Sequence, residues 1–238
     1  KYKKPLLSLV KRTVGFNQTL SEDYKGVGNH RFGGRPDLPI HIPYPTFFDP
    51  YRESVYHYEF ISQINCEEVA HLQNYLPRTG ILFFFFKSIH FFGYNNQDLA
   101  KVLYVHDNDT LLSGKRFELK EGDFFELPNG AYTPFKADAF AAVSVPSFYA
   151  HYQNTYLFEG KAKSLADQEE LLEDLYESYV EPVLFLQEFD HAVNSYGFTQ
   201  HESPELQAAL NHKGNPQDWV ILLHVKSRGD FQWGDAGD

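Results

Sequence analysis

Two stretches of the chain share one order of apolar and polar segments. In the first, the mostly apolar residues 58–65 precede a turn that ends in Gly80 and a continuous apolar run at 81–86. In the second, the apolar residues 219–225 precede a polar connection and a turn that ends in Gly237. A pattern repeated at wide separation predicts a duplicated unit in an α+β fold whose two halves share one core.

The strands are expected mainly from runs of apolar and aromatic residues between turn signals. The run at 81–86 predicts a strand buried on both faces, because it has no polar position. Further strands are expected at 60–64, 101–106, 116–119 and 124–127. Turn residues separate these segments, so the pattern favours antiparallel sheets with a few peripheral helices.

Three helices are expected. Asn65 is a candidate cap for a helix from Cys66 to about residue 75, with Glu68 completing a capping box. The strongest helical pattern runs from Leu165 to about residue 180, with an apolar face and many acidic residues on the others. A shorter helix is expected to begin at Pro204, since proline suits the first helical position.

Residues 26–50 are rich first in glycine and then in proline. Proline fixes φ and restrains the residue before it, so this segment is expected to be an extended, ordered loop. Its glycines lack the strand, helix and Gly-Lys-Ser/Thr ending of a phosphate-binding loop. We therefore predict that Gly33 and Gly34 are structural and that one of them has positive φ.

The composition favours a β-rich interior. Aromatic residues make up 17% of the 238 positions, with 22 Phe and 16 Tyr, and aromatic side chains favour strands. The length suits a single domain over 1–238, with repeat halves at about 26–130 and 131–238. The sequence contains no Met and ends just after Gly237. We therefore expect that the chain is trimmed or only partly given and that its final strand is missing.

The formal charge of −11 limits the classes of partner. Nucleic acid and anionic membrane surfaces would repel the protein, whereas a basic protein would attract it. The single cysteine, Cys66, excludes an intramolecular disulfide and fits a reducing compartment. No apolar run approaches the roughly 20 residues of a transmembrane helix.

Motifs for catalysis and for metal binding are weak. The 11 histidines include no His-Glu-x-x-His, and no Gly-x-Ser-x-Gly is present, so we expect no cofactor and no metal. Residues 107–109 carry closely spaced side-chain oxygens that could bind a hard cation. The glycine and the distant glutamate of a calcium loop are missing, so we expect these residues to form a hairpin turn. Cys66 lies at an expected helix N-terminus, which would stabilise a thiolate, but without a paired histidine it is expected to be inert.

Five polar residues lie beside predicted turns or strand ends, although they are far apart in the sequence. Polar groups beside buried strands need hydrogen-bond partners, and such residues often tie loops to the core. The alternative is a shared concave pocket where the two repeat halves meet, since ligand sites favour such interfaces. The candidate binding residues are Arg35, Asp37, Gln63, Gln200 and Asp235.

Five segments in this order resemble the YwqG-like family of uncharacterised bacterial proteins. They are residues 31–39, 60–65, 76–85, 191–200 and 218–237. The resemblance implies a soluble, cytoplasmic α+β protein with largely antiparallel sheet and an activity that is not established. It also implies a possible role in toxin immunity. Tyr44 departs from the family pattern, in which Trp is usual before the following proline.

These observations predict an interaction or ligand-binding protein without its own catalysis. As an immunity protein, it would cover the basic active site of a toxin with acidic surface, including the helix from Leu165. The alternative is a small-molecule-binding protein, or an enzyme without a recognisable motif, that uses the polar pocket between the repeat halves.

Overall fold

The computed structural model describes residues 10–50, 53–87, 98–106, 108–117, 132–145, 189–197, 204–227 and 229–231. The chain forms two units, each with its own internal contacts. Unit 1 consists of Lys1–Phe16 and Phe140–Asp238, and unit 2 consists of Asn17–Ala139. The expected strand at 124–127 and the expected helix from Leu165 lie outside the described residues.

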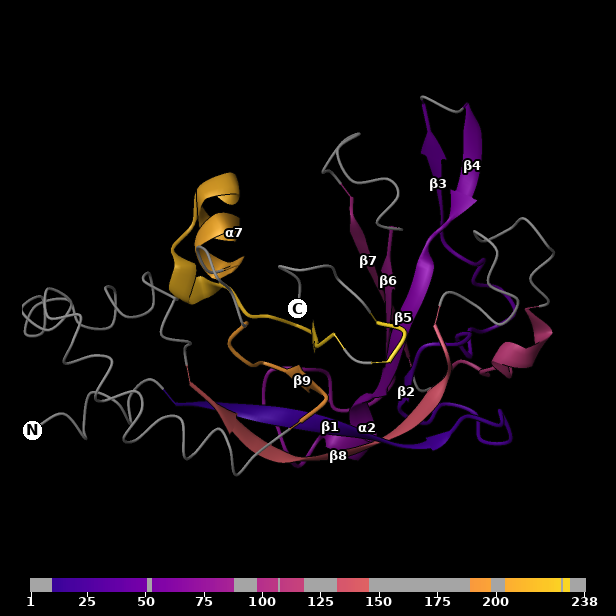
Figure 1. Ribbon diagram of the computed structural model, residues 1–238, viewed down its shortest axis with the longest axis horizontal. Helices are drawn as coiled ribbons and strands as arrows, with labels where there is room; N and C mark the ends of the chain where they lie inside the picture. Colours follow the sequence, from indigo (N-terminus) through magenta and orange to yellow (C-terminus); the bar gives the residue numbers. More distant parts are fainter. Residues whose placement is uncertain are drawn as a thin grey trace, which may run out of the picture. The chain divides into compact units, whose positions relative to one another are not determined.

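Unit 2 contains an antiparallel sheet. Its strands are β1 (Lys11–Ser21), β2 (Arg31–Phe32), β5 (Glu59–Asn65), β6 (Ile81–Phe86), β7 (Ala100–Val105) and β8 (Phe135–Ser144). Their hydrogen-bonded order is β1-β8-β2-β5-β6-β7, and β5, β6 and β7 run side by side in Figure 1. The division between the units falls within β1 and β8, so each of these strands contributes one part to unit 2.

Short elements complete unit 2. Strands β3 (Thr46–Asp49) and β4 (Ser54–His57) form a separate two-stranded hairpin that leads into β5 (Figure 1). The α-helix α2 (Cys66–Val69) follows β5 directly, and a 3₁₀ helix, η2, spans Gly114–Arg116. None of the helices in the described part of the chain has the length and apolar character that a membrane span requires.

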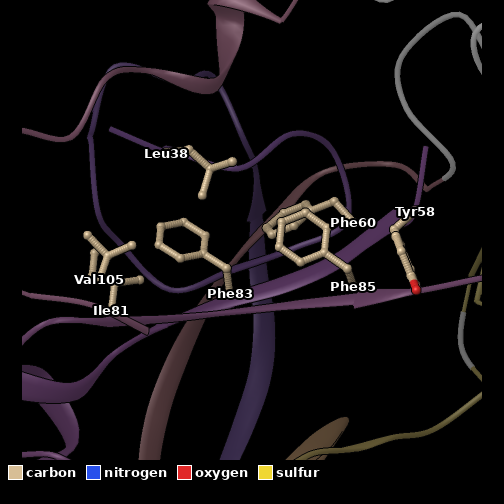
Figure 2. Close-up of a cluster of buried hydrophobic side chains, with 7 residues drawn as sticks. All are labelled: Leu38, Tyr58, Phe60, Ile81, Phe83, Phe85 and Val105. Atoms are coloured by element: carbon tan, nitrogen blue, oxygen red, sulfur yellow. The ribbon is translucent and has the colours of Figure 1, made fainter. Parts of the chain in front are cut away.

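The core of unit 2 lies on one face of β5 and β6. Phe60, Phe83 and Phe85 project from these strands toward Leu38, which faces them from the proline-rich loop (Figure 2). Tyr58, Ile81 and Val105 complete the buried cluster. Each of these side chains is at most 5% exposed, and burying one such side chain stabilises a fold by about 1.5–3 kcal/mol. The proline-rich loop is therefore held against the sheet by the apolar contacts of Leu38.

In unit 1, β9 (His191–Val193) pairs antiparallel with both β1 and β10 (His224–Val225). The order in this unit is β10-β9-β1-β8. Helix α7 (Pro204–His212) begins at a proline, as expected, and the 3₁₀ helix η4 spans Pro216–Asp218. Gly15 on β1 has a specific reason to be glycine, because an added Cβ would lie 2.6 Å from the Phe140 ring.

The mainly antiparallel α+β architecture agrees with the sequence, but some elements differ. The helix expected to reach residue 75 ends at Val69, because the Gln73 side chain accepts hydrogen bonds from Tyr75 N and Leu76 N and stabilises a turn. The strand expected at 116 is wrong at Arg116, which belongs to η2. Of the apolar run at 219–225, only residues 224–225 form a strand.

The duplication remains a prediction. Gly80 ends its turn with a positive φ of 80°. Gly237, on which Gly80 is expected to superimpose, lies outside the described residues. Strands β1 and β8 were not expected from the sequence, and they are the two strands that contribute to both units.

Candidate functional site

A buried arginine organises the loop between β1 and the core of unit 2. Arg31 lies on β2, where it pairs with Gln63 of β5 on one side and Lys136 of β8 on the other. The Arg31 side chain projects from one face of this sheet and is fully buried. All of its guanidinium nitrogens donate hydrogen bonds, to Glu22, Asn29, Arg35 O, Asp37 and Gln63.

Asp37 is the main acceptor of this cluster, which we call the Arg31 network. Its Oδ1 accepts from Arg31 Nη1 at 3.0 Å and from Gly114 N at 2.7 Å. Its Oδ2 accepts from Arg31 Nη2 at 2.9 Å, Gly28 N at 2.9 Å and Gln63 Nε2 at 2.8 Å. One carboxylate thus holds together β2, β5, the loop at Gly28 and the start of η2.

Gln63 has no hydrogen-bonding group left over. Its Oε1 accepts from Asp37 N at 2.9 Å, and its Nε2 donates to Asp37 Oδ2 and to Asn29 O at 2.9 Å. The residue is fully buried. A buried amide with both ends satisfied positions its neighbours, and it has no spare donor for a ligand.

Glu22 supplies the second buried carboxylate. Its Oε2 accepts from Arg31 Nε at 2.9 Å and from Asn29 Nδ2 at 2.8 Å. Burial by itself raises the pKa of Glu22, but the hydrogen bonds from Asn29 and Arg31 and the Arg31 charge together keep that pKa below its usual value. For Arg31, burial acts to lower the pKa, while the two carboxylates raise it above its ordinary value. Glu22 and Arg31 therefore stay charged at neutral pH.

Two glycines allow the loop to approach β8 closely. Gly33 and Gly34 have φ of 73° and 72°, which confirms and extends the prediction that one of them has positive φ. A Cβ on Gly33 would lie 2.4 Å from Thr133 O, and one on Gly34 would lie 2.2 Å from Tyr24 Oη. Only glycine fits at either position without a shift of the neighbouring backbone or ring.

The outer side of the network carries a different set of residues, which we call the surface cluster. Its members are half-buried: Tyr24, Arg35, Tyr44, Glu59 and Tyr132. Arg35 is held through its backbone, because its N–H donates to Tyr24 Oη at 3.0 Å and its carbonyl accepts from Arg31 Nη1 at 2.7 Å. No described carboxylate lies within ion-pair distance of its guanidinium.

Glu59 and two tyrosines form the other part of the surface cluster. Tyr132 donates its hydroxyl proton to Glu59 Oε2 at 2.8 Å. The Tyr44 ring packs edge-on against Phe85 and Phe117. Burial raises the pKa of Tyr44 and of Tyr132 above the ordinary tyrosine value, and the Glu59 charge raises both further. All of these hydroxyls therefore stay protonated at neutral pH.

A histidine links β2 to helix α2. His30 is 3% exposed; its Nδ1 accepts from Asn65 N at 3.1 Å, and its Nε2 lies 3.2 Å from Glu68 Oε2. Burial lowers the pKa of His30 to about 4, so the ring is neutral at physiological pH. Asn65 also caps α2 by accepting from Glu67 N, as expected.

Chemistry at the remaining polar groups of the described residues is limited. Burial raises the pKa of the Cys66 thiol to about 11, so the thiol stays protonated at neutral pH. In unit 1, Ser195 Oγ lies 3.1 Å from His224 Nδ1. Ser195 is fully buried, so this pair forms a structural hydrogen bond. No group of three metal-ligating side chains occurs in the part of the chain that the structure describes.

The structure brings some of the predicted site residues together. Asp37 and Gln63 contact each other inside the Arg31 network. The carbonyl of Arg35 accepts a hydrogen bond from Arg31, and the Arg35 residue is partly exposed. Gln200 and Asp235 lie outside the described residues, so the convergence of all five stays a prediction. Asp37 and Gln63 tie the loop to the core, which is the first of the two readings that the sequence left open.

Sequence reasoning missed the central residue, Arg31, and its partner Glu22. A signal was available for Arg31, because it is a charged residue between His30 and an apolar residue just before two glycines, in a segment expected to be ordered. No comparable signal marks Glu59 or Tyr132. They meet only because the loop at 132–134 packs beside residues 33–34.

A family model described as "Domain of unknown function (DUF1963)" matches residues 30–238. Among curated proteins, no significant match is found. The matched region includes Arg31, Arg35, Asp37, Glu59 and Gln63. The matched range therefore covers most of the site, and the description of the family gives no activity for it.

Proposed function

The chain belongs to the DUF1963 family, whose description assigns no function, and we propose from its own residues that it is a ligand-binding protein without its own catalysis. The proposed ligand contacts the surface cluster and places an anionic group on Arg35. The single observation that supports this proposal is the partly exposed guanidinium of Arg35, for which no ion-pair partner is found among the described residues, while its backbone is held by hydrogen bonds to Tyr24 and Arg31.

The backbone around Arg35 is held by packing and by hydrogen bonds. Gly114 packs against Arg35, since a Cβ on Gly114 would lie 2.6 Å from Arg35 O, and Gly114 N also donates to Asp37. Preorganised groups bind more tightly because less conformational entropy is lost on binding. Asp37 and Gln63 are thus proposed to position the site, and Arg35 is proposed to contact the ligand.

Tyr24 adds a hydrogen-bond donor beside this charge. Its Oη accepts from Arg35 N, and no acceptor for its own proton is found among the described residues. Burial raises the pKa of Tyr24, so the proton is retained at neutral pH. An anionic oxygen placed at Arg35 would accept hydrogen bonds from the guanidinium N–H groups and from the Tyr24 hydroxyl.

The overall charge limits the size of the proposed anion. At a formal charge of −11, the protein repels extended polyanions, so nucleic acid is a poor candidate. A small carboxylate or phosphate needs only one local cation. The bulk charge and the Arg35 site together favour a small molecule.

A basic protein partner is the second candidate, in keeping with an immunity role. The net charge of −11 supports this candidate. The acidic helix expected from Leu165, which would contact the partner, lies outside the described residues. The finer assignment to the bacterial YwqG-like group, and with it a cytoplasmic location, is likewise a proposal that rests on the sequence resemblance. Arg35 would hinder a cationic partner at the surface cluster, so the two candidates use different surfaces.

The test is a screen of small carboxylates, phosphates and amino acids against the whole chain, read by thermal melting and by calorimetry. We expect at least one compound to bind, and Arg35→Gln to weaken it at least tenfold without lowering the melting temperature. Lys101→Ala is the matched control, because Lys101 is an exposed cation on β7. Binding that Arg35→Gln leaves unchanged, or no binding in the screen, would overturn the proposal.

A further inference from the structure

A second cation is anchored beside Arg35, and it narrows the class of anion that this surface binds. Resting on the proposed function, we infer that the ligand is a small compound with a phosphate group, such as a phosphate monoester. The charge of the phosphate would be shared between Arg35 and Lys115, and the Tyr24 hydroxyl would donate to one of its oxygens.

The 3₁₀ helix η2 lies against the base of the Arg35 side chain. A Cβ on Gly114, the first residue of η2, would lie 2.6 Å from Arg35 O and 3.1 Å from Arg35 Cβ. Gly114 N donates to Asp37 Oδ1 at 2.7 Å, so the Arg31 network fixes this contact. Lys115 is the next residue, and consecutive Cα atoms are about 3.8 Å apart. The Arg35 and Lys115 side chains therefore leave the backbone from adjacent positions in space.

Tyr24 and Ser113 tie these positions together. Tyr24 Oη accepts from Arg35 N at 3.0 Å, and Tyr24 O accepts from Ser113 Oγ at 3.4 Å. Ser113 Oγ in turn accepts from Lys115 N at 3.4 Å. Tyr24 thus contacts both the residue that carries the guanidinium and the turn that carries the ammonium group. The three ligand-binding residues have a common support.

Neither cation is neutralised within the described part of the chain. The exposed Lys115 and the partly exposed Arg35 have no carboxylate there within ion-pair distance. Arg116, which follows Lys115, donates to the neutral carbonyls of Leu38 and Pro39 at 2.7 and 3.0 Å. These cations occur together in a chain with 32 acidic and 21 basic residues, in which a nearby carboxylate would be the common arrangement.

The two buried carboxylates of the Arg31 network do not compete with the ligand. Asp37 accepts from Arg31 Nη1 and Nη2, and Glu22 accepts from Arg31 Nε. Both carboxylates are buried together with Arg31. Their charges are therefore compensated below the surface, and Arg35 and Lys115 stay available above them.

A phosphate group suits this set of donors better than a carboxylate does. A phosphate monoester carries about two negative charges at neutral pH and has three terminal oxygens, whereas a carboxylate has one charge and two oxygens. A guanidinium binds two phosphate oxygens side by side, and an ammonium group is a mobile point charge that can reach the third. A carboxylate on Arg35 would leave Lys115 without a partner.

The experiment compares anions that differ in charge. At about pH 8, methyl phosphate carries two negative charges and dimethyl phosphate carries one, while acetate is the carboxylate reference. Each compound is titrated at constant ionic strength into the whole chain labelled with [¹⁵N]arginine, and the side-chain Nε–H signals are followed. Arg35→Lys identifies the signal of Arg35. The titrations are repeated with Lys115→Gln and with the control Lys101→Gln, which removes an exposed lysine on β7.

We expect methyl phosphate to shift the Arg35 signal and to bind about tenfold more tightly than dimethyl phosphate or acetate, because it gains one more charge-assisted interaction. Lys115→Gln should remove most of this preference and leave the dimethyl phosphate affinity nearly unchanged. Lys101→Gln should change neither affinity.

Three results would overturn the inference. If acetate or dimethyl phosphate binds through Arg35 as tightly as methyl phosphate, the ligand class is wrong and the proposed function stands. If Lys115→Gln weakens methyl phosphate no more than Lys101→Gln does, Lys115 does not contact the ligand. If none of the three compounds shifts the Arg35 signal, the phosphate inference fails, and the broader screen shows whether another small anion binds Arg35.

Discussion

Replacing Asp37 by Asn tests whether the Arg31 network holds the loop of unit 2 in place. The substitution keeps the size of the side chain but removes its charge, and it turns one acceptor oxygen into an N–H₂ donor. Asp37 accepts five hydrogen bonds from four residues, Gly28, Arg31, Gln63 and Gly114. At least two of these donors would then face another donor.

The expected cost follows from the burial of the pair. Arg31 and Asp37 are both fully buried, and removing one member of a buried ion pair costs about 3–5 kcal/mol. Each buried N–H left without an acceptor adds about 1–3 kcal/mol, although these terms overlap and do not simply add. We therefore expect Asp37→Asn to lower the free energy of unfolding by about 4 kcal/mol. That is a large part of the roughly 5–15 kcal/mol of a typical domain.

The assay is guanidinium unfolding followed by far-UV circular dichroism, with native-state hydrogen exchange of β5 as a local readout of unit 2. Asp109→Asn is the control, because Asp109 is partly exposed and its carboxylate lies 3.6 Å from the Nε2 atom of the exposed His41. A double variant with Arg31→Gln should lose at least about 1.5 kcal/mol less than the sum of the single variants. Equal costs for Asp37→Asn and Asp109→Asn would refute the reasoning.

Two further predictions concern backbone strain and pH. Gly33→Ala should lower the free energy of unfolding by about 3 kcal/mol, because the added Cβ would lie 2.4 Å from Thr133 O. Gly229→Ala should cost only about 1 kcal/mol, because Gly229 also has positive φ but open space around it. Equal melting temperatures of the two variants would contradict this prediction. Burial lowers the pKa of His30 to about 4, from its ordinary value of 6.5. Between pH 6.5 and pH 4, the unfolded chain binds a proton on His30 that the folded protein does not bind. The free energy of unfolding should therefore fall by about 3 kcal/mol as the pH drops from above 6.5 to 4. His30→Asn, which keeps an acceptor for Asn65 N, should flatten this part of the stability curve measured by urea unfolding; an unchanged curve would show that His30 is not responsible.

Local patterns were sufficient where a residue's environment depends on its sequence neighbours. The continuous apolar run at 81–86 forms β6, and the proline at 204 begins α7. The adjacent glycines Gly33 and Gly34 adopt positive φ, and Asn65 caps α2, because backbone conformation and capping involve only a few consecutive residues.

The sequence by itself thus determined the antiparallel, aromatic-rich character of the fold, its continuously apolar strand β6 and the ordered loop at 26–50. Only the tertiary structure decided what the polar residues do. Arg31 and Gln63 are 32 positions apart and become neighbours through strand pairing, while Tyr132 reaches Glu59 from 73 positions away. Hydrophobic periodicity shows which face of a strand is buried, but it does not show which strands pair. The partners of a buried charge are therefore fixed by the topology of the sheet, and so is the choice of Arg35 as the cation left at the surface.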